Sequence, residues 1–162
     1  MLRPQVLGFG DAHDFLAELK PHEQLASDLP PRLLVGAFLF GQGPVNGAAI
    51  ADRCIAELRA HRVDALCVVI DAVDASSPFL QARARRFAAS VVRSIDIFSP
   101  LELGRDVLVF AIHASTESQR AVIAPRIIEL AERPIQFGDS VVLSATRLER
   151  TSIRATLQED LL

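Results

Sequence analysis

The sequence contains few of the residues on which several common function classes depend. Its 162 residues include two cysteines, Cys54 and Cys67, and a single lysine, Lys20. Two cysteines supply neither a disulfide framework nor a metal site, and both stand in apolar surroundings, so we expect buried, reduced thiols. The four histidines have no metal-ligand spacing, and no Gly-x-Ser-x-Gly turn is present. A histidine-based metal centre and a serine hydrolase are therefore disfavoured.

Charge and hydropathy exclude two further classes. The net charge is −3 and the isoelectric point is near 5.8, so the chain lacks the basic character typical of nucleic-acid binding. No apolar run reaches the length of a membrane span, and the N-terminus shows no basic-then-apolar signal pattern. With half of the residues apolar and 23% charged, the composition is that of a globular domain, for which we expect a cytoplasmic location.

The hydrophobic pattern predicts one α/β domain over residues 32–150. Residues 1–31 are interpreted as an N-terminal appendage or linker, and residues 151–162 as a C-terminal tail. Predicted strands are Arg32–Phe40, Ala65–Ala72, Ile97–Leu103, Val107–Ile112 and Val141–Thr146; predicted helices are Val45–His61, Pro78–Arg93 and 117–132. Helices between strands, with one hairpin turning at residues 104–106, predict a mixed central sheet flanked by helices, an α+β sandwich.

The segment Arg93-Ser94-Ile95-Asp96 stands at the predicted end of a helix, directly before that hairpin. An arginine offers a planar fork of donors that matches two acceptors on a guanine edge. An aspartate accepts from guanine N–H groups. Arg93 and Asp96 are therefore candidate guanine-binding residues.

Several segments, in their order and spacing, resemble a GGDEF domain, the fold of diguanylate cyclases, over about two-thirds of the chain. They are GQGPVNGAAI (41–50), with Asn46 at the family's Asn; VVIDAVD (68–74); RSID (93–96); IAPRIIEL (123–130); and SVVLSAT (140–146). RSID is similar to the RxxD inhibitory site, which an arginine from a later helix completes in the family. The resemblance implies that Arg93, Asp96 and Arg126 bind cyclic di-GMP, which such sites commonly hold as an intercalated dimer able to bridge two protomers.

The departures from the family are at the catalytic positions. The signature turn is replaced by ELGRD (102–106), or by GRDVL (104–108) if two residues are inserted, with one glycine and an arginine in the turn. The segment after Asp71 is too short for the family's substrate contacts. The resemblance therefore implies a domain without cyclase activity or cofactor that acts as a cyclic di-GMP effector or adaptor and recruits protein partners in signalling or localisation.

Three alternatives stand beside this hypothesis. In the first, Arg93 and Asp96 bind no ligand and are surface charges, whose ion pair would contribute less than about 1 kcal/mol to stability. In the second, the chain is a receiver-like or ferredoxin-like interaction module that binds no nucleotide, and Asp71 imitates a phospho-acceptor. A functional receiver is disfavoured because it needs a lysine late in the fold, whereas the sole lysine is Lys20. Asp71 and Asp74 offer two carboxylates for Mg²⁺, but we expect them to be loop carboxylates that cap the following helix.

Overall fold

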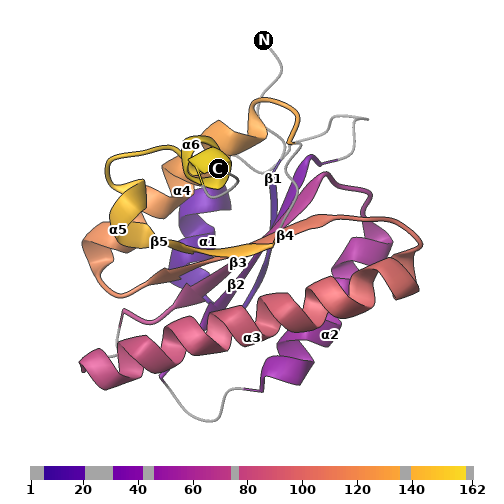
Figure 1. Ribbon diagram of the computed structural model, residues 1–162. Coiled ribbons are helices and arrows are strands. Elements are labelled where there is room, and N and C mark those ends of the chain that lie inside the picture. The colour runs from indigo at the N-terminus through magenta and orange to yellow at the C-terminus, as the bar shows by residue number, and fades with distance from the viewer. Residues whose placement is uncertain (1–5, 21–30, 42–45, 74–76, 136–139, 160–162) are drawn as a thin grey trace.

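The computed structural model describes residues 6–20, 31–41, 46–73, 77–135 and 140–159 (Figure 1). The strands are β1 (Val6–Gly10), β2 (Leu33–Leu39), β3 (Ala65–Asp71), β4 (Leu108–Ala114) and β5 (Val141–Ser144). The helices are α1 (His13–Leu19), α2 (Gly47–Ala60), α3 (Pro78–Leu103), α4 (Glu117–Ala131), α5 (Ala145–Leu148) and α6 (Ile153–Glu159).

The described strands form one sheet in the order β1-β2-β3-β4-β5, and every pairing is parallel. The three central strands are almost continuously apolar, and all seven residues of β3 are buried. Such strands need cover on both faces, which parallel sheets obtain from their crossover helices. The predicted α/β class, with a sheet flanked by helices, is confirmed. The predicted mixed sheet is corrected to a parallel one.

The sheet separates two hydrophobic cores. Helices α1, α4, α5 and α6 pack on one face, whereas α2 and α3 pack on the other (Figure 1). Because the strands follow one another across the sheet in chain order, crossovers on opposite faces have opposite hands. Two of the four crossovers therefore have the hand that is rare in known proteins.

Helix α3 replaces the first strand of the predicted hairpin. Ser77 caps its N-terminus, since the serine hydroxyl accepts a hydrogen bond from Leu80 N at 3.2 Å. The helix is 26 residues long and is followed by Gly104, which has a φ of +66°. The buried positions Val91, Ile95 and Ser99 recur every four residues, as a helix requires. The prediction of a strand over Ile97–Leu103 was wrong because it followed local β-propensity, whereas this helical spacing extends through the same residues.

The described helices and strand of both predicted flanks pack against the domain. Val6, Phe15 and Leu19 of β1 and α1 are fully buried, so residues 6–20 are part of the core and not an appendage. Ile153 and Leu157 of α6 join the same core, so the described part of the predicted tail also packs. The sequence did not predict this packing because these apolar segments are short, and their burial depends on the neighbouring strands and helices.

Pro125 lies inside α4, which begins at Glu117. Thr116 caps the helix, since its hydroxyl accepts from Gln119 N at 3.2 Å. A proline in a helix leaves the carbonyl four residues earlier without its usual donor. Both Pro125 and Ala121 are exposed, so water can satisfy that carbonyl and the helix continues.

Two glycines with positive φ give a matched test of the packing between β1 and β2. A Cβ on Gly10 (φ +119°) would lie 2.1 Å from the Ala37 carbonyl oxygen, whereas one on Gly104 (φ +66°) would meet no atom within 4 Å. We expect Gly10→Ala to lower the free energy of unfolding by about 3 kcal/mol or more, and Gly104→Ala by about 1 kcal/mol. Urea denaturation measures both. Equal losses would contradict the described approach of β1 to β2.

Candidate functional site

The carboxyl edge of the sheet carries a buried ion pair. The chain leaves β3 toward the face of α3 and leaves β4 toward the face of α4, which opens a crevice of the kind where α/β proteins bind ligands. Here Arg120 fills it: its Nη1 donates to Asp71 Oδ2 at 3.2 Å, while Val73 N donates to Asp71 Oδ1 at 3.2 Å. The two side chains are 18% and 3% exposed.

These contacts make Asp71 a structural carboxylate, but it does not cap the following helix as expected, because Ser77 caps α3. Both of its oxygens have donors, and Asp74 lies outside the described residues. Within the described ranges, no three histidine, cysteine, aspartate or glutamate side chains gather as a metal site. The expectation of buried, free thiols is confirmed, and burial raises the pKa of Cys54 to about 12 and that of Cys67 well above its usual value.

The RxxD residues lie apart from Arg126. Arg93 and Asp96 are exposed on α3, and neither makes a hydrogen bond or ion pair with any residue that the structure describes. Arg126 lies on α4, across the sheet, where its Nε donates to the Leu148 carbonyl at 3.0 Å and its Nη1 to Glu129 at 3.1 Å. Within one chain, therefore, Arg93 and Asp96 lie on the same helix, whereas Arg126 stabilises the packing on the opposite face of the sheet.

Beside Arg93, α3 presents large apolar side chains to solvent. Ile97, Phe98 and Leu101 are 57%, 50% and 81% exposed, and we call them the α3 apolar surface. Residues four apart on a helix are neighbours, so Ile97 lies one turn after Arg93, and Leu101 one turn after Ile97. Contiguous exposed apolar groups of this kind typically mark an interaction site.

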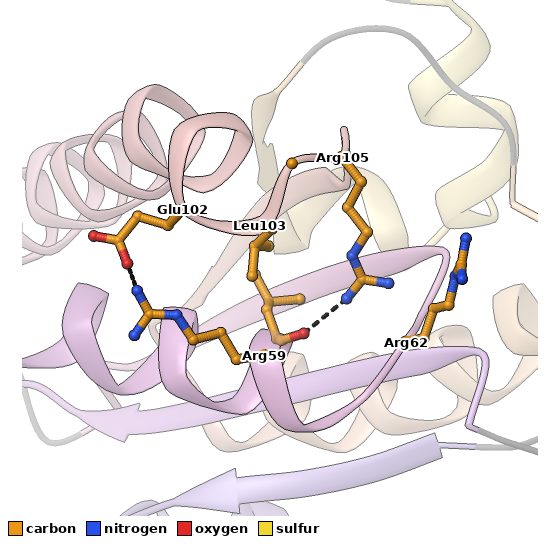
Figure 2. A pocket seen from close by; sticks show the side chains of 7 residues that line it. Arg59, Arg62, Glu102, Leu103 and Arg105 are labelled. Atoms are coloured by element: carbon orange, nitrogen blue, oxygen red, sulfur yellow. Dashed lines mark hydrogen bonds and ion pairs between the residues drawn. The ribbon is translucent and has the colours of Figure 1, made fainter.

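A pocket of about 470 Å³ lies where the C-terminal ends of α2 and α3 meet (Figure 2). We call it the arginine pocket; its lining residues are Leu58, Arg59, Arg62, Glu102, Leu103, Gly104 and Arg105. Arg105 Nη2 donates to the carbonyls of Leu58 at 2.7 Å and His61 at 3.1 Å, which ties this guanidinium to the last turn of α2. Arg59 forms an ion pair with Glu102.

The arginine pocket could not be predicted from the sequence because its two halves, residues 58–62 and 102–105, are forty residues apart in the chain. Four of its residues belong to ELGRD (102–106), which resembled a degenerate catalytic turn. In the structure Glu102 and Leu103 are the last residues of α3, and Gly104 is its left-handed cap. Asn46, similarly, caps α2 by accepting from Ala48 N at 3.1 Å and Ala49 N at 3.2 Å.

One further polar group is buried without a partner. His113 Nδ1, on the α3 side of β4, meets no hydrogen-bond partner within the described part of the chain. Burial, and then the charge of Arg85, lower the pKa of His113 below its usual value. The imidazole is therefore favoured in its neutral form, as a packed side chain.

Comparisons with protein-family models, with curated proteins and with solved structures found no match to this chain. The resemblance to GGDEF domains accordingly depends on the quoted sequence segments alone. None of the helices within the described ranges is both long enough and apolar enough to cross a bilayer.

The Asp71–Arg120 pair yields a stability prediction. Arg120→Ala leaves a buried carboxylate without its cation, which costs about 3 kcal/mol. We expect chemical denaturation to show that loss, and Asp71→Asn in the same background to recover part of it. Arg86→Ala is the control, since this exposed α3 arginine pairs with no described residue and should change stability by less than about 0.5 kcal/mol. Similar values for Arg120→Ala and Arg86→Ala would refute a structural role for the pair.

Proposed function

We propose that this chain is a signalling effector without catalytic activity, which binds cyclic di-GMP through Arg93 and Asp96 and recruits a protein through the α3 apolar surface. The observation that supports the proposal is that these charged and apolar side chains are all exposed on one helix. Arg93 and Asp96 are exposed and unpaired among the described residues, and three exposed apolar side chains follow within two turns. Ligand and partner would therefore meet on neighbouring parts of α3.

The chemistry of the two charged residues suits a guanine nucleotide. A guanidinium can donate two parallel hydrogen bonds to the O6 and N7 acceptors of guanine, and a carboxylate can accept from its N1–H and N2–H groups. Because neither side chain has to leave a partner in the described structure, binding carries no cost of breaking an ion pair. Ile97, one turn after Arg93, offers an apolar surface for the flat face of a base.

Arg126 has no part in this proposal. Its guanidinium supports the contact between α4 and the Leu148 carbonyl on the opposite face of the sheet. A third cation for a bound dinucleotide would therefore come from elsewhere, and a ligand that bridges two protomers would obtain it from the Arg93 of the second copy.

We propose that the chain lacks cyclase activity because of the structure of residues 102–106, at the C-terminal end of α3. The family's turn needs two glycines for close approach of substrate and an acidic group for the metal. Here the corresponding residues form the last turn of α3, one left-handed glycine, and Arg105, whose guanidinium bonds to α2. This arrangement resembles a helix end fixed by packing more than a nucleotide-binding turn.

A second candidate is an interaction module that binds no nucleotide. The position of Asp71 at the carboxyl end of β3 in a parallel sheet favours this receiver-like alternative, whereas the strand order β1-β2-β3-β4-β5 differs from the 2-1-3-4-5 order of flavodoxin-like folds. Asp71 is 4% exposed and bonded to Arg120, so it is poorly placed to accept a phosphoryl group. In this alternative the α3 apolar surface would act by itself.

Calorimetric titration of cyclic di-GMP separates the two candidates. We expect the wild-type chain to bind with a Kd on the order of 10 µM, and Arg93→Ala and Asp96→Ala each to weaken binding by about fivefold or more, because each removes hydrogen bonds to a base edge worth about 1–3 kcal/mol.

Arg86→Ala is the matched control, an exposed and unpaired arginine two turns earlier on α3, and it should bind as the wild type does. If the wild type gives no heat well above 10 µM, or if Arg93→Ala binds equally well, the ligand assignment fails and the interaction module becomes the better account.

A further inference from the structure

We infer that the arginine pocket is a second ligand site, which binds a phosphate-bearing small molecule of nucleotide size. Three arginines and one glutamate line it, so its lining is net positive although the whole chain has a net charge of −3. A local concentration of cations on an acidic protein needs an explanation beyond overall charge. This inference goes beyond the proposed function, since none of the lining residues belongs to the Arg93–Asp96 site.

The three guanidiniums retain donors for a ligand. Arg62 makes no hydrogen bond or ion pair with the described residues, although it lines the pocket. Arg105 uses one nitrogen, Nη2, for two backbone carbonyls and keeps Nε and Nη1 for other acceptors. Figure 2 shows the Arg62 and Arg105 guanidiniums on one side of Leu103, and the Arg59–Glu102 pair on the other.

The size and the charged lining of the pocket point to the class of ligand. A volume of about 470 Å³ is in the range of small-molecule sites. Arginine forks match the oxygens of phosphate in pairs, and such charge-assisted hydrogen bonds are about twice as strong as neutral ones. Leu103, which is only partly buried, adds apolar lining for the uncharged part of a ligand, whereas Leu58 is fully buried in the core.

The fixed position of Arg105 prepares the site. Its bonds to Leu58 and His61 hold the side chain against the end of α2, so little conformational entropy remains to be lost when an anion binds. Its charge also offsets the negative end of the α2 dipole, which would otherwise repel an anion at this position. Gly104 leaves the approach open, because a Cβ there would meet nothing within 4 Å.

Glu102 opposes anion binding in this arrangement. It occupies Arg59 as a counter-ion and places a negative charge on the pocket lining. Removal of that charge should free Arg59 and strengthen the attraction for phosphate. A substitution that tightens binding cannot be explained by damage to the fold, so this residue gives the test a clear direction.

The test is calorimetric titration of inorganic phosphate, pyrophosphate and AMP into the full chain and its variants. We expect saturable binding of pyrophosphate and AMP, weakened at least about tenfold by Arg62→Ala and tightened about threefold or more by Glu102→Gln. Arg86→Ala should leave it unchanged. Arg93→Ala should also leave it unchanged, which distinguishes this site from the proposed cyclic di-GMP site.

Two results would overturn the inference. One is the absence of saturable binding of any of the three anions at concentrations up to about 5 mM, the weak limit of a specific site. The other is binding that Arg62→Ala and Arg86→Ala weaken to the same extent, which would indicate a general charge effect. Far-ultraviolet circular dichroism of each variant, compared with the wild type, verifies that the fold is retained.

Discussion

The structure depends on the burial of three apolar strands on both of their faces. Strands β2, β3 and β4 carry almost no polar side chain, so the folded sheet is stable only when helices cover both of its faces. The face that α2 and α3 cover buries Val68 and Ile70, and the opposite face buries Cys67 and Val69. The positions of all the described helices follow from this requirement, including those of the two predicted flanks.

Helix α3 acquires its exposed surfaces because it is longer than the sheet that it covers. Seven-residue strands span about 23 Å, whereas 26 helical residues span about 39 Å. Its middle, from Ala84 to Ser99, includes its buried side chains, while Phe79 and Leu101 near its ends are 65% and 81% exposed. The overhanging C-terminal turns carry the α3 apolar surface and meet the end of α2 to form the arginine pocket.

The parts of the fold that the sequence predicts correctly are those where one local signal dominates. The continuous apolar run ending in Asp71 is a buried strand, and Pro78 after Ser77 begins a helix. The hairpin was predicted wrongly because Ile97 and Phe98 favour strands locally, while packing three and four residues apart favours the helix. Arg93 and Asp96 were identified as candidates from their spacing, yet the position of Arg126 across the sheet depends on the order of the strands, which no local pattern encodes. The arginine pocket is likewise formed by two helix ends that meet only in the folded chain.

The central claim, that α3 is the ligand-binding element, can be tested residue by residue. A ¹⁵N-labelled sample titrated with cyclic di-GMP and followed by heteronuclear NMR would report which backbone amides respond. The account predicts concentrated shifts around Arg93, Asp96 and Ile97, with the amides around Arg126 on α4 unchanged. Shifts concentrated on α4, or no shifts at saturating ligand, would contradict it.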